Sequence, residues 1–149
     1  MEKMTFKTEI NATAEKVWSV LFGETTYPLW ANVFSEGSKA ETDWKKGSKA
    51  LFIDPSNRGM VSKIAESIPY KFLSIEHLGM YDNGKEDYES EEVKKWAGAM
   101  ENYTLEEENG KTKLTIHMDM NNDPNMVAFF EKTWPTALAK VKELAEQDN

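Results

Sequence analysis

The hydrophobic positions of this chain follow two periods, that of short strands over most of its length and that of a helix at the end. In Asp123–Asn149, apolar residues recur every three or four positions. Asp123 is a suitable N-cap, and Pro124 suits the first helical position because its missing N–H is no loss there. The apolar stripe consists of Met126, Val127, Phe130, Trp134, Ala137, Leu138, Val141 and Leu144. It predicts a long amphipathic helix that must be buried against another layer.

Before this helix, apolar and polar residues alternate in short runs that turn-forming residues separate, which is typical of strands. The seven expected strands are Met4–Ile10, Ser38–Trp44, Lys49–Asp54, Met60–Ser67, Tyr70–Gly79, Met100–Glu107 and Lys111–Met120. Asn109 and Gly110 tolerate the positive φ of a type I′ turn, so the last two strands should pair antiparallel. The expected partner of the helix is therefore an antiparallel sheet.

Two short helices are expected after the first strand. Thr13 can cap a helix over Ala14–Phe22, which Gly23 ends. A second helical segment, Thr26–Val33, is interrupted early by Pro28. This segment should turn the following side chains toward the core: Tyr27, Leu29, Trp30 and Phe34.

The segment Tyr81–Gly98 is too polar and too rich in turn residues for a core strand, so we expect it to leave the sheet. Ser90 can cap a short helix that runs to Trp96. Long loops in small domains are often functional, and Trp96 could close over a cavity as a lid. Alternatively, Trp96 only fastens this excursion to the edge of the sheet.

Length and composition narrow the class of protein. A chain of 149 residues fits a single domain over 1–149. It has no cysteine, which excludes disulfides and thiolate chemistry and fits a reducing compartment. We see no signal peptide and no apolar run that could span a membrane, so we expect a cytoplasmic protein. The net charge of −8 makes nucleic acid an unfavourable partner.

Alternation along the strands predicts which side chains face the long helix. The inward set is Leu73, Ile75, His77, Tyr103, Leu105, Leu114, Ile116 and Met118, faced by Phe130, Trp134 and Leu138 of the helix and by Trp30 at one end. In the third strand, either Leu51 and Ile53 or Phe52 could face inward. These side chains could fill a closed core or form the wall of an apolar cavity.

Candidate catalytic chemistry is sparse. His77 and His117 fall on opposite faces of their strands, so they should not share a metal ion. His77 could bind a ligand by a hydrogen bond or act as a base, or it could simply be satisfied by backbone or water. The known hydrolase, metalloprotease and phosphate-loop motifs do not occur in the sequence. We therefore expect no catalytic residue, metal ion or cofactor, and an enzyme is unsupported.

Several segments together resemble the SRPBCC or START-like superfamily, which includes the birch-pollen allergen and polyketide cyclases. They are Ile10–Trp18, Trp30, Trp44–Gly47, Val61–Leu73 and Trp134–Leu144, in this order and spacing. Within the superfamily, the chain is most similar to the bacterial activator of heat-shock protein 90 ATPase homologue group. The resemblance implies an α+β helix-grip fold, in which a curved seven-stranded antiparallel sheet wraps around a long C-terminal helix, with two short helices after strand one.

The resemblance also implies an apolar cavity between the sheet and the helix. We expect it to bind an apolar small molecule, such as a lipid, an aromatic metabolite or a polyketide-like compound. The candidate ligand contacts are Trp30, Leu73, Ile75, His77, Trp96, Asn102, Tyr103, Leu114, Ile116, Met118, Phe130, Trp134 and Leu138. The alternatives are a co-chaperone-like adaptor in the stress response, which would bind a protein partner, and a cyclase or hydratase. We expect a monomer.

Overall fold

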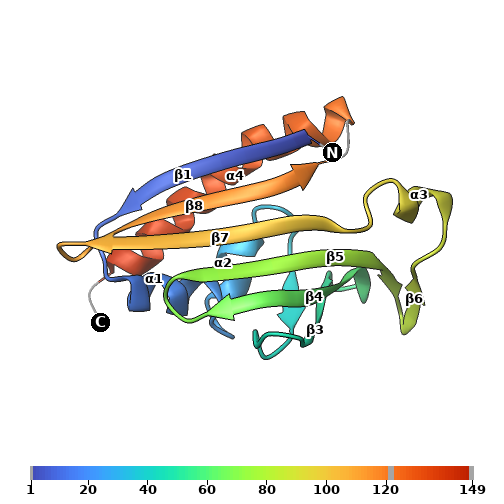
Figure 1. Ribbon diagram of the computed structural model, residues 1–149, viewed down its shortest axis with the longest axis horizontal. Helices are drawn as coiled ribbons and strands as arrows, with labels where there is room; N and C mark the ends of the chain where they lie inside the picture. The colour runs from blue at the N-terminus through green and yellow to red at the C-terminus, as the bar shows by residue number, and fades with distance from the viewer. Residues whose placement is uncertain (1, 121–122, 148–149) are drawn as a thin grey trace.

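The computed structural model describes residues 2–120 and 123–147 and consists of an antiparallel sheet curved around one long helix (Figure 1). The strands are β1 (Glu2–Ile10), β2 (Lys39–Glu41), β3 (Lys49–Ile53), β4 (Arg58–Ile68), β5 (Phe72–Asp82), β6 (Lys85–Asp87), β7 (Ala99–Glu108) and β8 (Lys111–Met120). The helices are α1 (Ala14–Leu21), α2 (Tyr27–Ala31), α3 (Glu91–Lys94) and α4 (Pro124–Glu146).

The strands follow the order β1-β8-β7-β5-β4-β3-β2 across the sheet, and β6 pairs with β5 outside this path. Helices α1 and α2 connect β1 to β2, which lie at opposite edges. Helix α4 contacts β1, α1 and α2, and these three helices lie behind the sheet in the view of Figure 1. This arrangement confirms the expected helix-grip fold, in which the sheet is open and not a closed barrel.

Local sequence signals explain where the main elements begin and end. The side chain of Asp123 accepts a hydrogen bond from the Asn125 amide at the start of α4, and Pro124 occupies its first turn. The side chain of Thr13 caps α1 in the same way. Asn109 and Gly110 have φ values of 55° and 78°, as a type I′ hairpin turn requires. These predictions are confirmed.

Two local predictions about strands are corrected and one ambiguity is resolved. Strand β2 ends at Glu41 and does not reach Trp44, whose φ of 60° turns the backbone away from the extended conformation. The polar stretch Lys85–Asp87 forms the additional strand β6, because it lies beside β5 and completes backbone pairing there. In β3, Phe52 packs against the core, which resolves the ambiguity for that strand.

Two apolar residues expected in the core are instead on the surface. Leu29 of α2 is 50% exposed and Met126 of α4 is 40% exposed. Most residues in the first turns of α4 are exposed, so sequence periodicity alone overestimates how much of the apolar stripe is buried. Helix α4 ends at Glu146, and the predicted extension over residues 148–149 lies outside the described residues.

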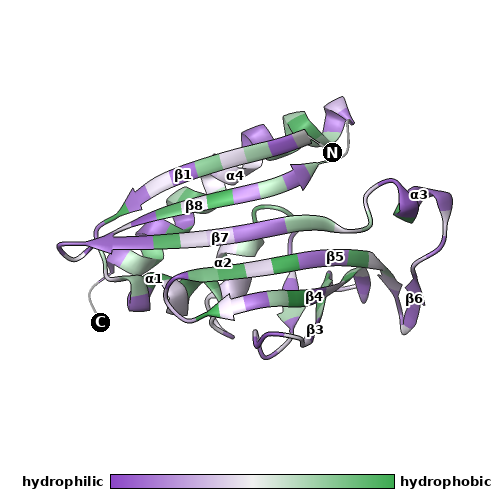
Figure 2. Ribbon diagram, in the orientation of Figure 1, coloured by the Kyte–Doolittle hydropathy of each residue, from purple (hydrophilic) through white to green (hydrophobic). Residues whose placement is uncertain are grey.

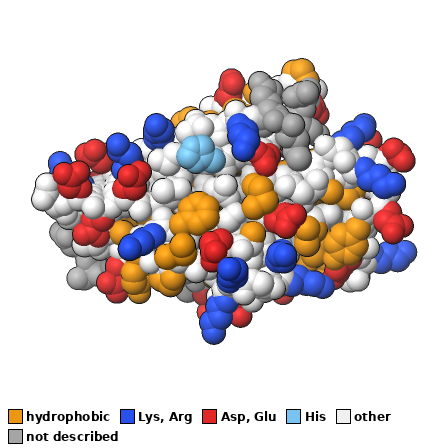
Figure 3. All heavy atoms as spheres, viewed as in Figure 1, with side chains coloured by type: hydrophobic (Ala, Val, Ile, Leu, Met, Phe, Trp, Pro, Cys, Tyr) orange, Lys and Arg blue, Asp and Glu red, His pale blue; other side chains and the backbone are white. Residues whose placement is uncertain are grey.

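The core lies between α4 and the face of the sheet that carries Ile75, Tyr103 and Ile116, which we call the inner face. Hydrophobic and hydrophilic residues alternate along the strands (Figure 2), because successive side chains point to opposite faces. Trp134 at the middle of α4 is 2% exposed and packs against the rings of Phe34 and Tyr103. The outer face carries charged side chains of both signs (Figure 3).

Candidate functional site

A cluster of four polar side chains lies on the inner face, surrounded by the apolar core. We call Ser62 of β4, His77 of β5, and Glu101 and Tyr103 of β7 the polar cluster. Ser62 Oγ lies 2.7 Å from His77 Nδ1, and His77 Nε2 lies 3.1 Å from Glu101 Oε1. The hydroxyl of Tyr103 donates to Glu101 Oε2. One imidazole and one phenol therefore form hydrogen bonds with the two oxygens of a single carboxylate.

Strand register brings these residues together. Ser62 pairs with His77 across β4 and β5, and Glu101 pairs with Ile75, the inward neighbour of His77 on β5. Glu101 and Tyr103 are two positions apart on β7, so their side chains share a face. The register between β4 and β5 shifts on both sides of the Ser62 pair, at Val61/Ser62 and again beyond Ile64. Such irregularities re-aim side chains locally, and here the result is that Ser62 faces the imidazole.

Burial and hydrogen bonding control the charge of the polar cluster. Burial raises the pKa of Glu101, but the hydrogen bond from His77, the electrostatic interaction with this ring and the hydrogen bond from Tyr103 outweigh it, so the pKa lies below its usual value. Burial, and then the nearby Glu101 charge, raise the pKa of Tyr103 well above 10. At neutral pH, Glu101 is therefore an anion and Tyr103 a neutral donor.

The polar cluster is not completely sealed. The side chain of His77 keeps 11% of its surface accessible and that of Glu101 keeps 15%. Because both side chains are on the inner face, this accessible surface adjoins space that can admit at least a water-sized group. A small polar part of a ligand could reach the carboxylate from that side.

Aromatic rings surround the polar cluster. Tyr27, Trp44 and Phe52 form a triangle with ring centroids 5.7 to 6.2 Å apart, and the ring of Phe52 lies 6.1 Å from that of His77. Burial, followed by the charge of Glu101, raises the pKa of Tyr27. These three rings are half-buried. They form the part of the aromatic lining that reaches the surface.

The structure brings most of the predicted ligand contacts together. The following lie in the core between the sheet and α4: Trp30, Leu73, Ile75, Tyr103, Leu114, Ile116, Met118, Trp134 and Leu138. Phe130 packs against this core and is half-buried. His77 faces inward as expected, whereas His117 is exposed on the outer face.

Two predicted contacts are not brought to this region. Asn102 lies on the outer face, where it accepts a hydrogen bond from Ser74, because it alternates with the inward Glu101 and Tyr103. Trp96 follows α3 and is not among the side chains that pack against the core of the described residues. Neither position contributes to the polar cluster.

The sequence-based prediction missed Glu101 and Ser62. Glu101 could have been found by strand parity, because it lies two residues before the inward Tyr103. Ser62 could not, since its alignment with His77 depends on the irregular register between β4 and β5. A carboxylate in an acidic sequence is also easily taken for a surface residue.

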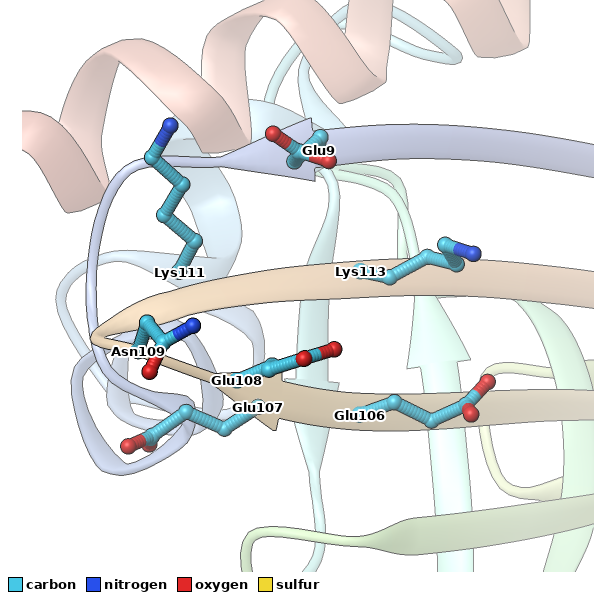
Figure 4. Close-up of a pocket in the computed structure, with 7 residues that line it drawn as sticks. All are labelled: Glu9, Glu106, Glu107, Glu108, Asn109, Lys111 and Lys113. Atoms are coloured by element: carbon cyan, nitrogen blue, oxygen red, sulfur yellow. The ribbon is translucent and has the colours of Figure 1, made fainter.

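A hollow separate from the polar cluster lies at the β7–β8 hairpin and the end of β1 (Figure 4). It has a volume of about 560 Å³ and is lined by Glu9, Glu106, Glu107, Glu108, Asn109, Lys111 and Lys113. Glu107 accepts a hydrogen bond from the Ala14 amide at 2.7 Å, so it fastens the hairpin to the start of α1. Charged groups line this hollow, and it lies apart from the core, so it does not suit an apolar ligand.

Metal binding and membrane insertion find no support in the part of the chain that the structure describes. Among residues 2–120 and 123–147, no group of histidine, aspartate and glutamate side chains has the geometry to hold a metal ion. Within the same part of the chain, none of the helices combines the length and apolarity needed to cross a bilayer.

Comparison with known proteins identifies the family. The family model described as Activator of Hsp90 ATPase homolog 1-like protein matches residues 11–146. The chain belongs to this family. The Activator of Hsp90 ATPase homolog 1-like match confirms the resemblance that the sequence motifs indicated. A search of curated proteins gives no match.

Solved structures of similar proteins share the fold. The Aha1 dimer from Colwellia psychrerythraea superposes with a TM-score of 0.71 at 19% identity, covering 98% of this chain and 97% of that one. CalU16 from Micromonospora echinospora gives 0.67 at 16% identity, with 99% and 76% covered. DynU16, from the dynemicin biosynthetic locus, gives 0.70 at 11% identity, with 99% and 48% covered. At these identities, the similarity establishes the fold of the family and not a shared activity.

Proposed function

We propose that this protein binds an apolar small molecule between the inner face of the sheet and α4, with the polar end of the ligand at His77, Glu101 and Tyr103. The observation that carries the proposal is the polar cluster itself. An ionised carboxylate among aromatic side chains is costly to bury, and groups of this kind concentrate at functional sites. Its residual accessibility supports a role in contacting a ligand.

The lining supports the same proposal. Aromatic and aliphatic side chains with a few convergent polar groups are typical of small-molecule sites. The proposed wall consists of Tyr27, Trp44 and Phe52, which keep accessible surface, and it adjoins the polar cluster. The dynemicin biosynthetic locus of DynU16 makes aromatic polyketide-like compounds reasonable first candidates, together with lipids.

The experiment is an NMR titration of labelled protein with a fatty acid, a flavonoid, an aromatic polyketide-like compound and a hydrophobic amine. We expect saturable shifts at inward positions such as Ile75, His77 and Tyr103. Their sequence neighbours Ser74 and Asn102 face outward and serve as internal controls on the same strands. The proposal would be contradicted by a ligand that shifts only the signals of the outward residues. It would also be contradicted if no compound of the panel shifts the signals of either the inward or the outward residues.

A second candidate function is protein recognition by an adaptor, and exposed apolar residues on α2 and α4 favour it. Leu29 is 50% exposed, Met126 40% and Phe129 41%. Since the Colwellia relative is a dimer, the first partner to test is a second copy of this chain. Sedimentation over a wide concentration range should then show association that Phe129→Ser abolishes, with Tyr70→Ser, at another exposed apolar position, as the control. A monomer at every concentration would reject this partner.

A further inference from the structure

The hydrogen bonds of the polar cluster assign the position of its protons. Within the described residues, Ser62 Oγ has a single hydrogen-bond partner, His77 Nδ1, and Ser62 is 1% exposed. If Nδ1 carried a proton, the buried serine proton would have no acceptor there, which is costly. The geometry therefore favours a neutral imidazole, in which Ser62 donates to Nδ1 and Nε2–H donates to Glu101.

In this arrangement, the two donors of His77 and Tyr103 point toward Glu101. Nε2–H of His77 reaches Oε1, and the Tyr103 hydroxyl reaches Oε2. No lysine or arginine of the described residues lies within 4.0 Å of this carboxylate, and the imidazole that contacts it is neutral in this arrangement. The remaining lone pairs of Glu101 can only accept, so the site carries negative charge without a fixed positive partner.

The neighbouring rings favour a positive charge at the same place. The faces of aromatic rings attract cations, and this attraction grows when water is excluded. Tyr27, Trp44 and Phe52 lie against one another beside the polar cluster and reach the surface. Trp44 sits in the loop between β2 and β3 with a φ of 60°, which few residues other than glycine adopt, so the loop holds the indole against its neighbours at some cost in backbone energy.

We propose that the ligand of this site is a hydrophobic amine, whose protonated nitrogen pairs with Glu101 while its apolar body packs among the aromatic rings. This inference rests on the function proposed above and specifies the ligand class. A fatty acid or another anion would place like charges together in the interior, so it should be rejected.

The test compares three probes of similar size by NMR titration at pH 7. They are phenethylamine, which is a cation, phenethyl alcohol, which is neutral, and phenylpropionate, which is an anion. We expect the amine to bind at least about tenfold more tightly than the alcohol and the anion to bind most weakly, with shifts at His77 and Phe52. An alcohol or an anion that binds as tightly as the amine would overturn the inference and leave the proposed function standing.

Variants identify the responsible groups. Glu101→Gln should remove the preference for the amine while leaving alcohol binding nearly unchanged, and Glu106→Gln, on the outer face of the same strand, should keep the preference. If Glu101→Gln does not fold, Trp44→Leu tests the ring contribution and should reduce the preference by about threefold. An unchanged preference in a folded Glu101→Gln protein would refute Glu101 as the counter-ion. No shift at inward residues with any probe would contradict both this inference and the proposed function.

Discussion

The Nε2 atom of His77 lies 3.1 Å from Oε1 of Glu101, on the face of the sheet that packs against the long helix. Removing His77 should therefore destabilise the folded protein. In His77→Ala, the carboxylate loses a donor and the Ser62 hydroxyl loses its acceptor, which should lower the free energy of unfolding by about 1.5–3 kcal/mol. Urea denaturation at pH 7 measures the change.

His117 provides the matched control for this substitution. It is exposed on the outer face of β8, so His117→Ala should change the free energy of unfolding by less than about 0.5 kcal/mol. Equal effects of the two substitutions would show that the His77 hydrogen bonds contribute nothing net to stability.

Stability should fall at alkaline pH because of two tyrosines of the inner region. Tyr27 and Tyr103 have pKa values in the folded state that burial and then the charge of Glu101 raise above the ordinary 10.0. Their contribution is fully present below pH 10 and decreases as the pH rises above it, because the unfolded state loses the phenolic proton first. Each tyrosine should lower the free energy of unfolding by up to about 1.4 kcal/mol per pH unit.

The measurement is urea denaturation at several pH values between about 9 and 11.5, a range set by the phenolic pKa. Tyr103→Phe cannot ionise at this position, so its stability should depend less steeply on pH than that of the wild type. If the free energy of unfolding of Tyr103→Phe falls with pH as steeply as that of the wild type, Tyr103 does not cause the loss of stability at alkaline pH.

The aromatic centre of α4 should carry much of the packing energy. Trp134 is 2% exposed, and its indole N–H donates to the sulfur of Met118 at 2.8 Å. Trp134→Ala should cost about 3–5 kcal/mol, because a large cavity would form. Trp96→Ala, at a half-buried tryptophan outside the core, should cost about 1 kcal/mol. Thermal or chemical unfolding compares the stabilities of the two variants. Similar losses of stability would argue against the packing of the sheet on α4.

The contact between Glu107 and the first turn of α1 should stabilise the junction of the hairpin and this helix. Amides at the start of a helix lack partners within the helix, and the Ala14 amide uses the Glu107 carboxylate. Glu107→Ala should cost about 0.5–2 kcal/mol, as the loss of a helix cap does. Glu108→Ala, at the neighbouring exposed position, should leave the free energy of unfolding nearly unchanged. Chemical denaturation compares the two variants, and equal losses would show that the Glu107 contact does not stabilise the junction.

The periodicity of the sequence is sufficient to predict most of the fold. The spacing of Phe130, Trp134 and Leu138 predicts α4, and the Asn109-Gly110 pair predicts the β7–β8 hairpin, because both signals act over a few residues. Strand parity likewise places His77 and Tyr103 on the inner face. The same local rule fails for Met126, because the pattern does not say where the covering elements end.

The sequence by itself therefore determined the order of the elements, the face that each strand buries, and the family to which the chain belongs. Only the tertiary structure decided that Ser62, His77 and Glu101 meet. Their contact depends on two register shifts between β4 and β5 and on the pairing of β5 with β7, which are relations between strands far apart in the chain. Such relations depend on the packing of the whole sheet around α4, which no short stretch of sequence specifies.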